Sequence, residues 1–279
     1  MRIKFSLKTF VISSLFLILF SPTYPHLFGR FAARDSYYSH GYLIPFVVLY
    51  LVWRKRDKLK AIKPEPAFAG ILILLFGIIL HLLGGIFLKI NFASYLAIPI
   101  VLLGMVLYFG GIKMAKELIF PIVFLIFMLP LPQVIIIGIS FKLKILAAQI
   151  ATFTVKIMGM PVNRSGSTIY YPGGFLLVGD PCSGLRSLIS FLALGAIFTQ
   201  FVRAKPWRKT ILFLSAVPIA FLSNAARLVF LLWVSYIYGE KIALGFLHDF
   251  SGIMVFIIGF LGLIMISKIL KCRLDGNIT

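Results

Sequence analysis

The sequence predicts an all-α polytopic membrane protein with about eight transmembrane helices, a short interfacial helix and a small β-hairpin on the outer face. Three observations lead to this prediction. Hydrophobic residues make up 61% of the 279-residue chain, whereas soluble domains contain roughly 45–50%. The apolar residues form runs of about 20, the length that a helix needs to cross a bilayer. Basic residues lie in the short segments between these runs, as the positive-inside rule predicts.

Eight hydrophobic segments can be interpreted as spans. The first follows Arg2, Lys4 and Lys8 and resembles a signal peptide, but it has no small-residue cleavage site and further spans follow. We therefore interpret it as an uncleaved first helix. Because no repeat or soluble linker interrupts the spans, residues 1–279 are predicted to form a single integral membrane domain. The predicted spans are 9–28, 38–53, 67–88, 92–112, 116–137, 183–202, 210–238 and 249–267.

The orientation follows from the distribution of the 28 Lys and Arg residues. If the amino terminus is cytoplasmic, most of them fall in cytoplasmic segments, including the runs Trp53–Lys63 and Arg203–Lys209. The opposite orientation would place the most basic loops outside. Both termini are therefore predicted to be cytoplasmic, in a multi-pass protein of the cell membrane. Since these loops account for the net charge of +20, we do not expect a nucleic-acid partner.

The longest segment predicted to lie outside, about 138–182, has two parts. In Phe141–Gly159, apolar residues recur at helical spacing with lysines on another side, a pattern typical of an interfacial helix. A ninth span is the alternative. Further along, the short apolar runs Thr168–Tyr171 and Phe175–Val178 flank Pro172-Gly173-Gly174. This pattern predicts a β-hairpin on the outer face.

Cys182 or Ser183 is predicted to begin the sixth span, after the turn Gly179-Asp180-Pro181. The positive end of a helix dipole and a nearby cation both favour a reactive thiolate. Arg186 is four residues further along and is expected on the same helix face. The alternative is that Cys182 is a small apolar filler. The other cysteine, Cys272, is predicted on the cytoplasmic side, so we expect no disulfide.

Two further polar residues are predicted in the outer half of the membrane. Arg227 lies deep within the span 210–238, where a charge is costly and usually functional, and Asn224 shares its face. The alternative for Arg227 is a side chain that extends to the interface. His248 precedes the last span and could exchange protons near neutral pH, although a single interfacial histidine is often incidental. With Cys182 as nucleophile, these groups would supply the components of an acyl-transfer site.

Other chemistries lack their usual sequence patterns. The chain has no metal-ligand spacing, no phosphate-binding loop and only eight acidic residues, so we expect no metal and no cofactor. Three alternatives stay open at this point. They are a non-catalytic membrane scaffold, an anion transporter that uses Arg227 and His248, and an enzyme that acts on lipid phosphates.

Three blocks, PCSGLRSL (Pro181–Leu188), VPIAFLSNAARLVF (Val217–Phe230) and GFLHDFSGIMVF (Gly245–Phe256), together resemble the exosortase/archaeosortase family. The resemblance extends to YYSHGYLIPFVVLYLVWRKR near the amino terminus, to MLPLPQVI and to the hairpin turn. It implies a membrane cysteine protease or transpeptidase that sorts proteins of the cell envelope. Its substrates would be membrane-anchored proteins with a C-terminal sorting signal, as in PEP-CTERM proteins: a short motif, one transmembrane helix and a basic tail.

The resemblance also implies roles for individual residues. The family's catalytic Cys, Arg and His correspond to Cys182, Arg227 and His248, within a catalytic core of about 165–260. Arg186 and Asn224 are second-rank candidates for electrostatic support. The sequence departs from the family pattern at Asp180-Pro181, where many members have a small residue before the cysteine. This difference concerns the subfamily and the signal that it recognises.

Overall fold

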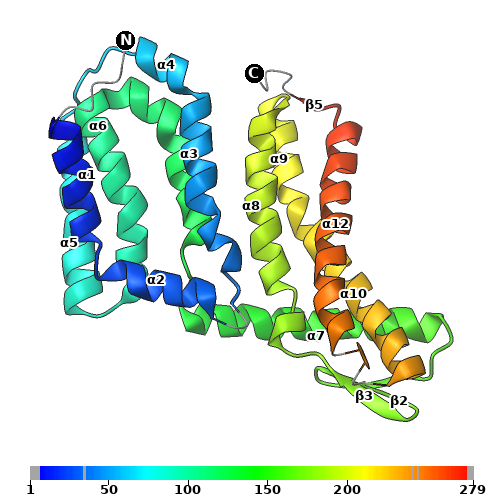
Figure 1. Cartoon of the computed structure of the whole chain (residues 1–279). Helices are drawn as coiled ribbons and strands as arrows, with labels where there is room; N and C mark the ends of the chain where they lie inside the picture. Colours follow the sequence, from blue (N-terminus) through cyan, green and yellow to red (C-terminus); the bar gives the residue numbers. More distant parts are fainter. Residues whose placement is uncertain (1–6, 34–35, 240–241, 244, 275–279) are drawn as a thin grey trace. The chain divides into compact units, whose positions relative to one another are not determined.

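The computed structural model describes residues 7–33, 36–239, 242–243 and 245–274 (Figure 1). The chain forms two compact units, Met1–Pro132 and Gln133–Thr279, and both are mainly helical. In the described residues, six helical stretches are long and apolar enough to cross a membrane. The number is seven if the bent pair Val11–Leu19 and Thr23–Ala32 forms one span. The chain is therefore a mostly helical protein with several candidate membrane spans.

In the described residues of the first unit, all regular elements are helical. Its elements are α1 (Leu7–Leu19), α2 (Thr23–Ala32), the 3-10 turn η1 (Ser39–Tyr42), α3 (Ile44–Arg54), α4 (Arg56–Ala61), α5 (Ala69–Ile79), the π-helical η2 (Leu80–Phe87), α6 (Asn91–Phe124) and the 3-10 turn η3 (Leu125–Met128). The helices α5 and α6 pack closely because glycines lie at their contact. At Gly70 a Cβ atom would collide with the backbone of Tyr108, and at Gly104 with the backbone of Leu74.

The predicted spans of this unit differ from the observed helices in two places. The segment 92–112 and the first part of 116–137 lie on α6, which breaks at Gly111 (φ 80°, ψ −176°), close to the predicted boundary between them. Glycine adopts this conformation readily. The second segment also extends too far, because Pro130 and Pro132 separate η3 from the next helix. The predicted span 38–53 corresponds to the short turn η1 and to α3, which has only 11 residues. The eight-span topology therefore stays a prediction.

The second unit combines a helical bundle with a small sheet. Its elements are α7 (Gln133–Ile157), β1 (Asn163–Ser165), β2 (Thr168–Tyr171), β3 (Gly174–Leu177), the 3-10 turn η4 (Asp180–Cys182), α8 (Leu185–Phe201), β4 (Val202–Arg203), α9 (Pro206–Leu214), α10 (Ala216–Tyr238), α12 (Phe246–Ile269) and β5 (Arg273–Leu274). Figure 1 shows α7 crosswise to α8 and α12. This arrangement favours the interfacial interpretation of α7, although α7 is long and apolar enough to span.

The predicted β-hairpin is confirmed. Strands β2 and β3 pair antiparallel, with Tyr171 opposite Gly174 and Pro172-Gly173 between them. Gly173 has a φ of 92°, so proline and glycine occupy the central positions of a type II turn. A third strand, β1, pairs antiparallel with β2 and was not predicted, since its residues Asn163–Ser165 are polar.

The hairpin, α7 and α10 enclose one apolar cluster. Buried alanines of α7, Ile169 and Leu176 of the hairpin, and Leu228 and Leu231 of α10 belong to this cluster. Cys182 belongs to it as well. The thiol is therefore held where the sheet leads into the helical bundle.

Candidate active site

Cys182 lies in a short turn ahead of α8. It is the last residue of η4, and 6% of its surface is exposed. Gly184 follows at a φ of 83° and is the N-cap of α8, which begins at Leu185. The candidate span Asp180–Phe201 begins close to Cys182, as predicted. The expectation that Cys182 and Arg186 share a face of one continuous helix is wrong. A left-handed glycine interrupts the helix between them, and no sequence periodicity reveals such a break.

Two contacts attach this turn to neighbouring helices. The ammonium group of Lys144, on α7, lies 3.0 Å from a carboxylate oxygen of Asp180. On α10, the side-chain NH₂ of Asn224 donates a hydrogen bond of 3.0 Å to the backbone carbonyl of Cys182. Asn224 is 1% exposed. The predicted supporting residue Asn224 thus contacts the nucleophile candidate through its backbone.

Arg227 lies one helical turn after Asn224. Its Nε donates a hydrogen bond of 2.8 Å to the hydroxyl of Ser251 on α12. Burial disfavours the ionised form of the Cys182 thiol and is the larger effect, whereas the positive charges of Arg227 and Arg186 favour that form. The structure therefore brings together Cys182, Arg227, Arg186 and Asn224, which the sequence predicted as candidates.

Ser251 was not predicted. It is 2% exposed and links Arg227 to α12. The available signal was its position three residues after His248, because residues three apart share a helix face. The backbone at position 248 lies in the first turn of α12, but the side chain of His248 is outside the described residues. The proximity of His248 to Cys182 stays a prediction.

Both cysteines are in the described part of the chain, and no disulfide joins Cys182 to Cys272. Cys272 lies beyond the carboxyl end of α12, whereas Cys182 precedes the amino end of α8.

The sequence matches the transmembrane exosortase family over residues 32–265, which is most of the chain. The chain belongs to this family. Neither the curated proteins nor the solved structures yielded a match. Exosortases are generally membrane proteins of cysteine-type transpeptidase or protease character, with a role in protein sorting and processing. The matched region contains all five residues that the sequence predicted for the site.

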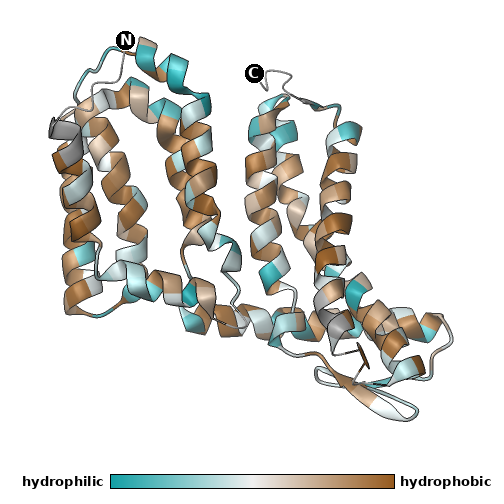
Figure 2. Cartoon of the chain, in the orientation of Figure 1, coloured by the Kyte–Doolittle hydropathy of each residue, from teal (hydrophilic) through white to brown (hydrophobic). Residues whose placement is uncertain are grey.

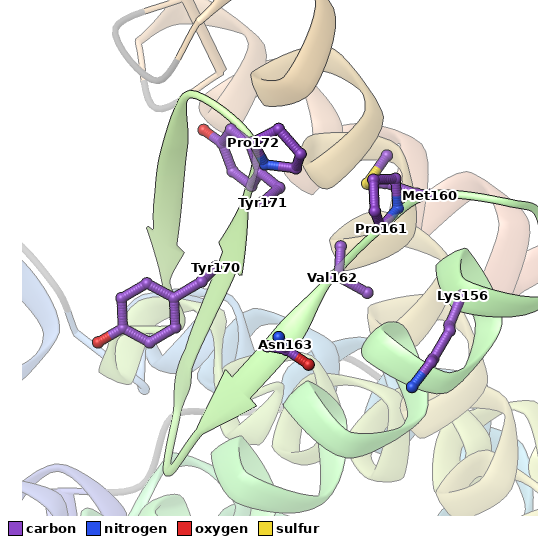
Figure 3. A pocket seen from close by; sticks show the side chains of 8 residues that line it. All are labelled: Lys156, Met160, Pro161, Val162, Asn163, Tyr170, Tyr171 and Pro172. Carbon is purple, nitrogen blue, oxygen red and sulfur yellow. The ribbon is translucent and has the colours of Figure 1, made fainter.

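The exosortase also has a pocket of about 460 Å³ beside its sheet (Figure 3). The pocket lies where the chain before β1 diverges from the end of β2. Its lining residues are Lys156, Met160, Pro161, Val162, Asn163, Tyr170, Tyr171 and Pro172. Met160, Val162 and Tyr171 are also members of the apolar cluster that contains Cys182. The wall of this pocket and Cys182 therefore pack in the same apolar cluster.

Proposed function

We propose that this exosortase is a membrane-embedded cysteine protease or transpeptidase. It cleaves substrate proteins that carry a C-terminal sorting signal, composed of a short motif, a transmembrane helix and a basic tail. The observation that supports this proposal best is the combination of a buried thiol with two guanidinium charges that act on it. Cations near a cysteine favour the thiolate, which is the nucleophilic form.

The proposed reaction has two steps. The Cys182 thiolate attacks the carbonyl carbon at the sorting motif, and the C–N bond breaks to give a thioacyl enzyme. His248 donates a proton to the leaving nitrogen, and the fragment with the helix and basic tail departs. His248 then accepts a proton from the incoming nucleophile, which attacks the thioester carbonyl and releases the Cys182 thiolate.

Arg227 is the proposed source of electrostatic stabilisation. A fixed cation in a site with little water lowers the energy of a developing oxyanion without further reorganisation. Its bond to Ser251 restricts the guanidinium group, which supports a fixed position during the reaction. Arg186 and Asn224 are proposed as supporting residues, Arg186 through its charge.

The proposed orientation places the Cys182 end of the second unit outside the cell. At the other end, β4 pairs with β5 and brings Arg203 opposite Arg273. Figure 2 shows hydrophilic residues at this end, where α8 and α12 finish. The positive-inside rule assigns such an end to the cytoplasm, and the Cys182 turn precedes α8 at the opposite end.

The proposal is tested by co-expression with a reporter that ends in a cognate sorting signal. Cleavage is followed as a size shift on an immunoblot. We expect Cys182→Ala and Cys182→Ser to abolish the shift, whereas Cys272→Ser, the matched control, keeps it. Wild-type cleavage by Cys182→Ala, at equal protein level, would show that Cys182 is not the nucleophile.

A further inference from the structure

The backbone carbonyl of Cys182 lies at a break between two helical elements. The turn η4 ends at Cys182, and α8 begins three residues later, after the left-handed Gly184. Buried carbonyl groups at helix breaks are generally hydrogen-bonded by other parts of the chain. Here the donor is the Asn224 side chain of α10, at 3.0 Å.

The same side chain makes a second, steric contact with the turn. If Gly184 carried a Cβ atom, that atom would lie 2.9 Å from Nδ2 and 3.0 Å from Cγ of Asn224. Glycine at this position therefore adopts the left-handed backbone conformation without strain and also leaves space for the Asn224 amide. A hydrogen bond and a packing contact thus attach the turn to one residue of α10.

The orientation of the amide is determined by Cys182. The oxygen Oδ1 of Asn224 is buried and has no hydrogen-bond partner in the described part of the chain. If the amide were rotated, Oδ1 would face the Cys182 carbonyl, and two acceptors would be in contact. An unsatisfied buried polar atom is uncommon in a folded protein and calls for an explanation. The explanation here is that Nδ2 donates to the Cys182 carbonyl, and this orientation leaves Oδ1 without a partner.

Asn224 and Arg227 are three residues apart on α10 and share a face. One contacts the backbone of Cys182, and the charge of the other acts on its thiol. We propose that Asn224 is a positioning residue that fixes the Cys182 turn relative to Arg227. It acts through the backbone and not through electrostatic support of the reacting atoms. The role of Asn224 in catalysis rests on the proposed function, whereas the effect of Asn224 on the thiol does not.

The test measures how fast iodoacetamide alkylates Cys182, without any substrate. A Cys272→Ser background leaves Cys182 as the one cysteine, and rates are compared from about pH 6 to pH 10 in detergent. Asn224→Ala removes the donor and the packing contact, and Asn224→Leu keeps about the same volume without the NH₂ group and without adding a charge. Ser223→Ala is the matched control, because Ser223 is the preceding residue on α10 and is also buried. Thermal unfolding is recorded for each variant.

We expect Asn224→Ala and Asn224→Leu to slow alkylation near pH 7 by about tenfold and to move the pH midpoint upward, because the thiol loses its fixed distance to a cation. Ser223→Ala should keep the wild-type profile within about twofold. Gly184→Ala disturbs the same contact from the other side and should give the same shift. Combined with Asn224→Ala, it should add little, because both changes remove one interaction.

An unchanged pH profile in both Asn224 variants would overturn the proposal, even if they unfold at lower temperature, since that result marks a purely structural role. If Asn224→Ala does not accumulate, Asn224→Leu and Gly184→Ala decide the question. Processing of the reporter separates the two proposals. If Cys182→Ala still cleaves the reporter while Asn224→Ala shifts the alkylation profile, the proposed function is wrong and the positioning role stands.

Discussion

His81 in the first unit and Asn224 in the second are both polar residues buried among apolar helices, but their hydrogen bonding differs. His81 is 0% exposed, and its ring nitrogens contact the Ser94 hydroxyl at 3.1 Å and the Leu19 carbonyl at 2.9 Å. Asn224 uses its NH₂ group on Cys182 and leaves Oδ1 without a partner among the described residues. A buried residue whose polar atoms all have neutral hydrogen-bond partners is typical of a structural role. A buried residue that lies beside a thiol and has one polar atom unsatisfied indicates a functional site.

For His81, hydrogen bonding is a better guide to its role than its position in the fold. It lies in the π-helical segment η2, and such segments often mark functional sites. Leu19 is the last residue of α1, so its carbonyl has no partner within the helix. The ring of His81 satisfies this carbonyl and packs against Phe20, with ring centroids 4.5 Å apart. His81 therefore connects α1, η2 and α6, and its location alone would have suggested the wrong role.

The largest effect is expected at Arg227. Arg227→Ala should reduce reporter processing by about 10²–10³-fold, the usual effect of losing a group that stabilises transition-state charge. Arg227→Lys keeps a charge but changes the donor geometry, so its loss should be smaller. Ser251→Ala removes the acceptor of the Nε bond and keeps the guanidinium group, so it should be the mildest of the three. Equal processing by all three variants and the wild type would remove Arg227 from the site.

At His81 we expect an effect on stability and none on the reactivity of Cys182. His81→Ala should lower the free energy of unfolding by about 1–3 kcal/mol, because two buried groups lose their partners. His81→Phe keeps the ring volume and separates the lost hydrogen bonds from the lost packing. Neither variant should alter the pH profile of Cys182 alkylation. A changed profile would contradict the comparison, because His81 would then influence the thiol.

Local patterns in the sequence predicted much of this fold, and non-local geometry explains the remainder. The hairpin was predicted because Pro172-Gly173 determines its own turn. The break at Gly111 lies close to the predicted boundary between the spans 92–112 and 116–137, where Lys113 and Lys116 interrupt the apolar run. Cys182 and Arg227 were selected by their types and settings. Gly184 and Ser251 were missed, because one depends on a backbone angle and the other on a partner from another helix.

A smaller effect is expected at His40, a second histidine of the first unit with a hydrogen bond to a backbone carbonyl. His40 Nε2 contacts the Phe127 carbonyl at 3.1 Å. Burial lowers the pKa of His40 below its ordinary value of 6.5, and this bond partly opposes the shift. The unfolded chain therefore binds a proton more readily than the folded one. Stability should be complete above about pH 6.5 and should fall as the pH drops through the folded-state pKa.

This prediction is measured as the difference in melting temperature between about pH 7.5 and pH 5.5. His40→Gln should reduce the difference. His26→Gln, at an exposed position on α2, is the control and should keep it. If the His40 variant retains the full difference, another group is responsible for the acid sensitivity.

The smallest effect is expected at the ion pair between Lys144 and Asp180. The side chain of Lys144 is 21% exposed and that of Asp180 is 63% exposed, and such pairs contribute about 0–1 kcal/mol. Lys144→Ala should therefore reduce processing by no more than about threefold, and about 1 M salt should mask the difference by screening. The charge-exchanged variant, Lys144→Asp with Asp180→Lys, should recover part of the loss. A much larger loss, insensitive to salt, would mean that this exposed contact restrains the Cys182 turn as strongly as the buried Asn224. The distinction between the two kinds of contact would then rest on their distance from the thiol and not on their burial.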